Sequence, residues 1–275
     1  MQAHKVIAIR PIWPNVGSRN RYRHQITTLI KEMAESVLYW LTVKRKSAPP
    51  ILATDASPVE EMLKELRKLF KHWQGRFDEM APRVAESFVK NQFRGTDSAF
   101  RQALRDAGWS VEFTMTPAMR DAFEASLAEN VGLIKSIPAE YLQEVEGIVM
   151  WNYAAGRDLK SMAAEIRGRY DVAANRAVLI ARDQSNKANA VVQRARQQEL
   201  GITEAQWLHS HAGKEPRPTH VAMNGKRYLI SKGMYDSAVQ RYIWPGEEIN
   251  CRCVGRSVLP FTPAANQASP GQKTI

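Results

Sequence analysis

The chain has 275 residues, of which 44% are hydrophobic and 24% are charged, a balance that is typical of globular proteins and excludes wholesale disorder. Its 39 basic and 28 acidic residues give a formal net charge of +11, which favours partners that carry negative charge. The chain has two cysteines, no recognisable signal peptide, and no apolar run near the roughly 18 residues that a membrane span requires. We therefore expect a soluble intracellular protein of one or two domains with no membrane contact.

The basic surplus is concentrated in residues 1–50, which hold nine Lys or Arg against two Glu. This segment is predicted to be an arm with a short strand at Val6–Ile9, followed by a helix from Tyr22 to Leu41, where apolar residues recur at helical spacing. Basic side chains at both ends of this helix are typical of contacts to DNA or to an acidic protein surface. The candidate contacts are Arg19, Arg21, Arg23, Lys44, Arg45 and Lys46.

Residues 51–200 are predicted to form a helical body. Ser57-Pro58-Val59-Glu60 combines the spacing of a capping box with a proline at the first helical position, where its missing N–H costs nothing. We expect this helix to kink or break at Pro82, and separate helices to begin at Thr116-Pro117 and Ser136-Ile137-Pro138. The remaining predicted helices run from Asp158 to Gly168 and from Val172 to Leu200, with Gly201 closing the second.

The long helix carries a pattern that predicts packing against the segment after it. Arg176 and Asp183 are two turns apart on one face, while Ala177 and Ala181 permit another element to approach closely. Charged side chains at such a seam commonly fix the orientation of the two parts. The residues predicted to lie at the seam are Arg176, Arg182, Asp183 and Asn189.

Residues 201–261 are predicted to form a compact module of small strands and loops, because short segments of β-propensity alternate with Gly and Pro. The predicted strands lie within Gln206–His209, Lys226–Ile230 and Cys253–Val258. Met223-Asn224-Gly225-Lys226 is predicted to be a hairpin turn. Residues 262–275 are poor in large apolar side chains and are predicted to be a flexible tail. The fold class is therefore α+β, with a mostly helical N-terminal body and a small α+β C-terminal module.

The module also contains the residue types that bind metals. Thiolates and imidazoles are the preferred ligands of Zn²⁺, and a structural zinc site can hold two loops together in a module with a small core. The candidate metal ligands are His211, His220, Cys251 and Cys253. The alternative is that no cofactor binds, and that the histidines join a hydrogen-bonded network while the cysteines are buried as small hydrophobic side chains. We expect packing on the long helix, rather than zinc, to stabilise the module.

The order Trp207, Arg217-Pro218-Thr219-His220, Asn224-Gly225, Pro245-Gly246-Glu247 and Asn250-Cys251-Arg252-Cys253 resembles the C-terminal module of Mu F-like minor head proteins of tailed bacteriophages, over roughly residues 176–260. In such proteins the long helix typically carries Thr-Glu where this chain has Asp183-Gln184. His220 stands where related minor head proteins often carry the second cysteine of a Cys-x-x-Cys pair. A complete zinc site therefore requires His211 or His209 as a substitute ligand.

The resemblance implies a structural minor head protein that acts in head morphogenesis at the portal vertex, contacts packaged DNA in some cases and influences its ejection. The implied partners are the portal protein, the major capsid or scaffolding protein and non-specific DNA. The implied location is the interior of the virion head near the portal, and the host cytoplasm during assembly. No catalysis is implied. The alternative function is a metal-dependent His/Asn nuclease acting on phage or host DNA, suggested by His209, His211, His220 and Asn250.

Overall fold

The computed structural model confirms the predicted α+β class, with long helices and a small set of antiparallel strands. It divides into two compact units, which we call the sheet unit and the bundle unit. The sheet unit comprises Met1–Val16, Lys90–Glu124 and Arg182–Ile275, and the bundle unit comprises Gly17–Val89 and Ala125–Ala181. These units do not follow the predicted boundaries at residues 50 and 200. The described residues are 6–47, 58–155, 159–213 and 215–260, so the predicted tail at 262–275 lies outside them.

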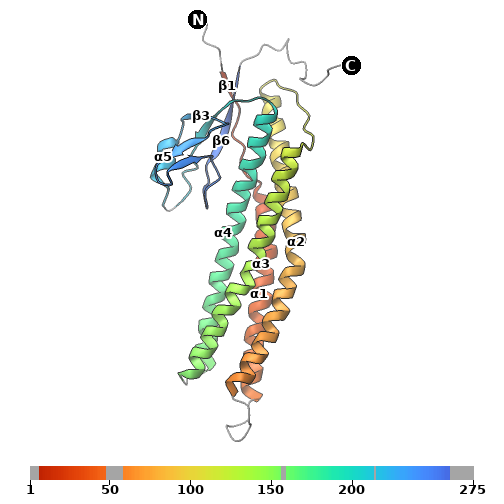
Figure 1. Ribbon diagram of the computed structural model, residues 1–275, viewed down its shortest axis with the longest axis vertical. Coiled ribbons are helices and arrows are strands. Elements are labelled where there is room, and N and C mark those ends of the chain that lie inside the picture. The colour runs from red at the N-terminus through yellow and green to blue at the C-terminus, as the bar shows by residue number, and fades with distance from the viewer. Residues whose placement is uncertain (1–5, 48–57, 156–158, 214, 261–275) are drawn as a thin grey trace. The chain divides into compact units, whose positions relative to one another are not determined.

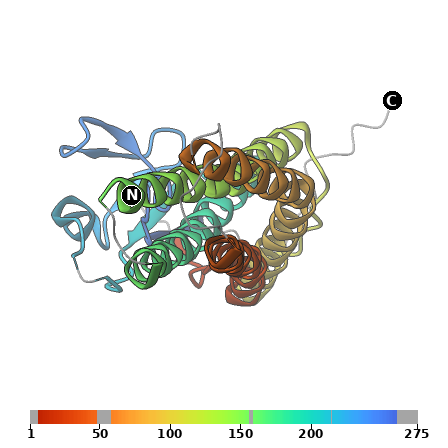
Figure 2. The ribbon, with the colours of Figure 1, turned by 90° about the horizontal axis from the view of Figure 1, so that it is seen from below.

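Helices account for most of the described chain. Their bounds are α1 (Val16–Ser47), α2 (Pro58–Asp106), α3 (Pro117–Ala154), α4 (Leu159–Glu199) and the short α5 (Pro218–Met223). In the bundle unit, α1 lies beside the first part of α2, most of α3 and the first part of α4, as the view along the helices shows (Figure 2). None of the described helices is both long enough and apolar enough to cross a bilayer.

The core of the bundle unit follows from the periodicity of α1. Tyr22, Ile26, Ile30 and Met33 recur every three or four residues and are all fully buried. The Tyr22 ring stacks on Phe88 with 4.0 Å between ring centroids, and its hydroxyl donates a 2.8 Å hydrogen bond to Oδ1 of Asn130. The helix begins six residues earlier than predicted, at Val16, so a segment expected to be an irregular arm is helical.

The helix start predicted at Ser136-Ile137-Pro138 is wrong, and of the kink or break predicted at Pro82 the break does not occur. Pro82 lies inside α2 and Pro138 lies inside α3, and each helix continues through its proline. A proline inside a helix costs about 3 kcal/mol, because it removes one backbone hydrogen bond and crowds the preceding turn. In α2 this cost is offset by an apolar face that continues in register on both sides of the proline. The buried residues of that face are Phe77, Ala81, Val84, Ala85 and Phe88.

The two helices predicted at Asp158–Gly168 and Val172–Leu200 are likewise one helix, α4, and Asp158 lies outside the described residues. The predicted stop at its end is confirmed. Gly201 adopts φ +66°, and the N–H of Ile202 donates to the carbonyl of Gln197 at 2.9 Å, which satisfies a terminal carbonyl of the helix.

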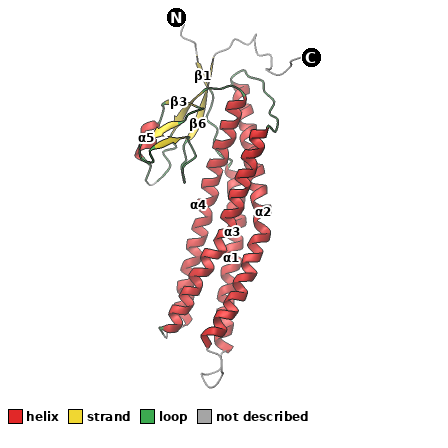
Figure 3. Cartoon of the chain, viewed as in Figure 1, coloured by secondary structure: helices red, strands yellow, loops and turns green. Residues whose placement is uncertain are grey.

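The strands gather in the sheet unit, with α5 beside them (Figure 3). Their bounds are β1 (Val6–Ala8), β2 (Glu204–Leu208), β3 (Arg227–Leu229), β4 (Met234–Asp236), β5 (Arg241–Ile243) and β6 (Val254–Pro260). The main sheet is antiparallel in the order β1-β6-β2-β3, and β4 pairs with β5 as a separate hairpin. The strands predicted at Gln206–His209, Lys226–Ile230 and Cys253–Val258 are present with shifted ends, whereas β4, β5 and α5 were missed.

The first described strand forms an edge of this sheet, so the N-terminal segment is part of the module's fold. β1 pairs with β6, with Ile7 opposite Leu259 (Figure 1). The predicted hairpin turn at Asn224-Gly225 is wrong, because this turn joins α5 to β3 and not two strands. Only Gly225 has positive φ, at +78°, and its N–H donates to the carbonyl of Trp207 at 2.8 Å.

The core of the sheet unit draws on three distant parts of the chain. Trp207 is fully buried at its centre, among apolar side chains from the N-terminal segment, from the second part of α2 and from the strands. The module therefore does not depend on its own residues alone for a core, which is completed by side chains from the N-terminal segment and from α2. The buried partners from outside residues 201–261 are Ile9, Ile12, Phe100, Ala103 and Leu104.

Candidate functional site

One histidine and both cysteines meet in the sheet unit. Nδ1 of His220 lies 3.5 Å from Sγ of Cys251 and 3.8 Å from Sγ of Cys253. The three atoms all lie within 4.8 Å of one another, and the three residues are only 2–3% exposed. We call these three residues the His-Cys cluster.

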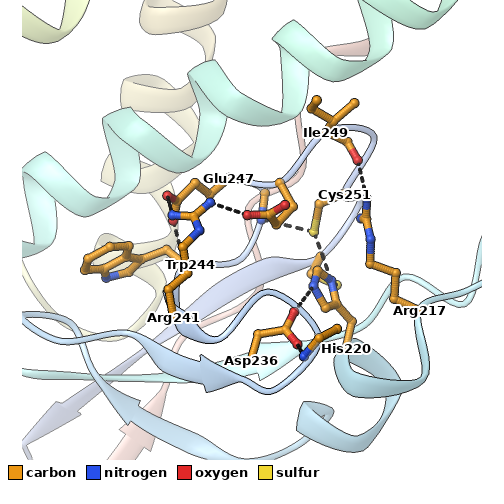
Figure 4. A network of polar contacts seen from close by, with 12 residues as sticks. Arg217, His220, Asp236, Arg241, Trp244, Glu247, Ile249 and Cys251 are labelled. Carbon is orange, nitrogen blue, oxygen red and sulfur yellow. Dashed lines mark hydrogen bonds and ion pairs between the residues drawn. The ribbon is translucent and has the colours of Figure 1, made fainter.

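Local chain geometry explains why these groups converge. α5 begins at Pro218 and carries His220 inward, while the exposed Arg217 donates a 2.8 Å hydrogen bond to the carbonyl of Ile249 in the facing loop (Figure 4). That loop turns at Gly246, which has φ +85° and donates its N–H to Sγ of Cys251 at 3.4 Å. A Cβ at Gly246 would lie 3.0 Å from Cβ of Ala190 in α4, so glycine lets the loop approach this helix closely.

A buried carboxylate fixes the orientation of the histidine ring. Nε2 of His220 lies 3.2 Å from Oδ2 of Asp236, which is 1% exposed, and Oδ1 of Asp236 accepts the N–H of Ala238 at 2.9 Å. Burial acts to raise the pKa of Asp236, but the Ala238 N–H and His220 favour the carboxylate and lower this pKa overall. The edge of the Trp207 ring packs on the other side, 5.3 Å from His220 between ring centroids.

The two thiols differ in their environment. Cys251 accepts a hydrogen bond from the Cys253 thiol and is also buried, and His220 and the Gly246 N–H stabilise its thiolate further. These contacts lower the pKa of Cys251, whereas the same thiol–thiol contact and burial raise the pKa of Cys253. Burial acts to lower the pKa of His220, but the contact with Cys251 raises it overall.

The side chains at this site are of kinds that occur in two chemical roles, catalysis and metal binding. A thiolate, an imidazole and a carboxylate in a row can form a nucleophile, a base and an orienting group, and two thiols and an imidazole can ligate a metal ion. At 2–3% exposure, Cys251 and His220 face the protein interior, so a substrate has no direct approach to them. The arrangement is better suited to holding the module together than to covalent chemistry.

Residues 143–256 match the model of the Phage Mu protein F like family. Over this region the chain is similar to the family. A curated relative, described as an uncharacterized protein of Haemophilus influenzae, is 28% identical over 246 residues. The alignment covers 86% of this chain and 52% of the relative, so the chain spans about half the length of that relative. No solved structure matches the chain. The match supports the family predicted from the sequence.

In this Mu F-like protein, His211 does not join the His-Cys cluster. It is exposed in the loop after β2 with φ +51°, and its backbone N–H donates to Nδ1 of His209 at 3.1 Å. His209 is half-buried; its pKa is lowered by burial first and then by His211, and the charges of Cys251 and His220 also act on it. Asp236, in contrast, was missed by the sequence reasoning, since one acidic residue among 28 has no local pattern that marks it.

The predicted seam between the long helix and the Mu F-like module is present for part of its residues. Asp183 is 9% exposed and accepts the backbone N–H of Asn250 at 2.6 Å, and Arg182 donates to Oδ1 of Asn250 at 3.1 Å. Asn189 is buried at a different contact, where its amide donates to the carbonyl of Ile12 at 2.9 Å.

Arg176 does not lie at this seam. It belongs to the bundle unit, forms a 2.5 Å ion pair with Glu140 and donates to Oγ of Ser136 at 2.9 Å. Ala177 and Ala181 also belong to the bundle unit, and both are buried. The contacts that sequence reasoning missed include Arg194, whose guanidinium lies 4.5 Å from the centre of the Trp244 ring, and Gln197, which donates to Ser257 at 2.8 Å.

The predicted basic contacts of the Mu F-like protein lie on α1 but do not form one patch. Arg19 is half-buried, while Arg21 and Arg23 are exposed. Arg19 and Arg23 are four residues apart and share a face, whereas Arg21 projects from the opposite side of the helix. The helix also continues through Lys44, Arg45 and Lys46, whose side chains lie outside the described part of the chain.

Proposed function

We propose that this Mu F-like protein is a structural minor head protein of a tailed bacteriophage, which acts in head morphogenesis at the portal vertex and performs no catalysis. The family match supports the head-related role. The burial of the His-Cys cluster supports the structural role, because a nucleophile or a general base must be within reach of its substrate. The protein is located inside the virion head near the portal, and in the host cytoplasm during assembly.

The positions of the candidate nuclease residues favour this proposal over the nuclease alternative. A His/Asn nuclease requires its histidines and asparagine to converge on one metal ion and one phosphate. Here His220 is buried against Asp236, His211 is exposed in a loop, and Asn250 accepts a hydrogen bond from Arg182.

A cleavage assay tests the absence of catalysis. We expect intact plasmid after incubation of the full chain with Mg²⁺, Mn²⁺ or Zn²⁺, and the same result for His211→Ala. Cleavage that depends on the metal and disappears in His211→Ala or His220→Ala would overturn the proposal, provided that circular dichroism shows both variants to be folded.

Two exposed aromatic side chains of the bundle unit are candidates for protein contacts. Tyr39 is 72% exposed and Trp151 is 61% exposed. Large aromatic side chains are enriched at the energetic centres of protein interfaces, and their exposure in a free subunit is costly unless a partner covers them. We propose that the bundle unit docks on portal protein subunits through these side chains, with major capsid or scaffolding protein as further neighbours during assembly.

Capture by the portal protein of the same phage tests this docking. We expect Tyr39→Ser and Trp151→Ser together to weaken capture by at least tenfold, because they remove two aromatic anchors. Tyr235→Ser is the matched control, since Tyr235 is a comparably exposed tyrosine (54%) in the sheet unit. Unchanged capture of the double variant, or an equal loss in the control, contradicts docking through these side chains. Deletion of residues 1–50 is unsuitable as a test because it removes β1 and α1.

Contact with packaged DNA has support from a basic surface on the first turns of α2. Exposed basic side chains recur there on neighbouring turns and line an open hollow together with Leu63 and Glu60. A polyanion bound to such a surface releases counterions, so its affinity falls steeply as salt rises. The basic residues that line the hollow are Lys64, Arg67, Lys68 and Lys71.

Salt titrations of DNA binding separate this surface from the α1 candidates. Replacement of the four basic residues of the α2 hollow by Gln should flatten the dependence of affinity on salt. Replacement of Arg19, Arg21, Arg23, Lys44, Arg45 and Lys46 by Gln should do so as well if both helices contact DNA. A salt dependence that neither set changes assigns both surfaces to protein contacts.

A further inference from the structure

We propose that His220, Cys251 and Cys253 are ligands of one structural Zn²⁺ ion, with Asp236 orienting the imidazole ligand. The inference goes beyond the proposed function, because it concerns what stabilises the Mu F-like module and requires neither a portal nor DNA. It also differs from the set expected from sequence, since it excludes His211 and adds Asp236 behind the histidine.

The spacing of the three ligand atoms fits a tetrahedral ion. Zinc–sulfur bonds of about 2.3 Å and zinc–nitrogen bonds of about 2.0 Å, at tetrahedral angles, place sulfur and nitrogen about 3.6 Å apart. Nδ1 of His220 lies 3.5 Å from one sulfur and 3.8 Å from the other. The two nitrogen–sulfur distances of the His-Cys cluster therefore match those around a tetrahedral Zn²⁺ ion.

A metal ion would bind all three groups of the His-Cys cluster at once. One ring nitrogen offers either a single N–H or a single lone pair, so Nδ1 of His220 can satisfy one of the two sulfur atoms that face it. A zinc ion accepts a lone pair from all three atoms at once. Two thiolates and a neutral imidazole also balance the charge of Zn²⁺, which suits a site whose ligands are 2–3% exposed.

The surroundings of the cluster match those of metal-binding histidines. Such histidines commonly place their second ring nitrogen against a carboxylate, which fixes the tautomer and the ring orientation. Here Nε2 of His220 lies 3.2 Å from a carboxylate that is itself held by the Ala238 N–H. In the proposed site a water molecule takes the fourth coordination position.

Metal analysis of the full, reduced chain tests the proposal. We expect one Zn²⁺ per chain by elemental analysis, and the absorption of tetrahedral, thiolate-bound Co²⁺ after chelation and refilling with cobalt. Cys251→Ser with Cys253→Ser should abolish both signals, and His220→Ala should weaken metal affinity by at least tenfold. His211→Ala is the matched control and should retain one ion per chain.

Two measurements keep the test decisive if the cysteine variants do not fold. Chelation of the wild-type chain should lower its melting temperature, and added Zn²⁺ should restore it. A folded, reduced wild-type chain that holds no Zn²⁺ and does not take up Co²⁺ overturns the proposal. Retention of a full equivalent of zinc by a folded double-cysteine variant overturns it equally.

Discussion

The two units of this protein bury different kinds of side chain. In the bundle unit the buried interior is almost wholly apolar, and its buried polar residues among those described are Ser18, Asn130 and Asn152. The sheet unit buries a long series of polar side chains, mostly from α4 and the strands. These are Gln92, Thr96, Asp183, Gln184, Ser185, Asn186, Asn189, Gln193, Arg196, Gln197, His220, Asp236 and Ser257.

This difference in buried side chains indicates which sequence features determine the fold of each unit. An apolar interior tolerates exchange of one hydrophobic side chain for another of similar volume, so the bundle unit depends on periodicity and volume. A buried polar group must find its own partner at the right distance, so the sheet unit depends on particular pairs. Substitutions in the two units should therefore differ in cost even where burial is equal.

The largest effect is expected at Arg196, a buried arginine of the sheet unit. Its side chain is 2% exposed, donates to both carboxylate oxygens of Asp97 at 2.9 and 2.7 Å, and pairs with Glu199 at 2.6 Å. Arg196→Met leaves both carboxylates without their partner and should lower the free energy of unfolding by about 3–5 kcal/mol. Urea denaturation followed by circular dichroism measures this loss. A loss smaller than that for an exposed ion pair would contradict the proposed difference between the two units.

A smaller loss is expected at Asn189. Its side-chain oxygen accepts from Thr96 at 3.1 Å, and its amide donates to the carbonyl of Ile12 at 2.9 Å. Asn189→Leu keeps the volume but removes the partner of the Thr96 hydroxyl, while the Ile12 carbonyl keeps the hydrogen bond from Gln193 at 3.0 Å, so the cost should be about 1–3 kcal/mol. If the leucine variant unfolds at the same urea concentration as the wild type, the polar network does not specify this unit.

The corresponding exchange in the bundle unit should be tolerated. Ile30 is fully buried among apolar side chains, and Ile30→Leu conserves its volume, so we expect a cost below about 1.5 kcal/mol. The same urea experiment compares it directly with Asn189→Leu. An equal or greater cost at Ile30 would show that shape, and not polar pairing, limits both units.

The smallest effect is expected for an exposed ion pair. Arg83 and Glu79 are 3.4 Å apart, with side chains that are 71% and 61% exposed. Arg83→Gln should change the free energy of unfolding by about 0–1 kcal/mol, because water already solvates both charges. This variant is the reference for Arg196→Met, since it also removes an arginine but leaves no buried partner without its ion pair.

The fold could be predicted from the sequence where hydrophobic periodicity is strong. The prediction failed where packing outweighs the local sequence signals. The helical face of α1 and the stop at Gly201 follow from spacing and from glycine's tolerance of positive φ. Pro82 and Pro138 were expected to break helices, but buried faces on both sides outweigh the local cost. β4 and β5 have three residues each, which is too short for an alternating pattern to be recognised.

The candidate site was predictable by residue type and not by position. His220, Cys251 and Cys253 were identified as candidate ligands by their chemistry, whereas the loop that carries His211 turns it outward. Arg176 shares a helix face with Asp183 in the sequence pattern, but the boundary between the two units falls between Ala181 and Arg182. A helical wheel contains no information on where a long helix passes from one unit to the next.

The central claim, a structural role at the portal vertex, is tested most directly by the protein content of phage heads. Heads assembled with and without the portal protein can be purified and the amount of this chain measured by quantitative mass spectrometry. We expect a few copies in each head that contains a portal, and loss of the chain from heads that lack one. Equal amounts in both kinds of head, or absence of the chain from portal-containing heads, would contradict the account.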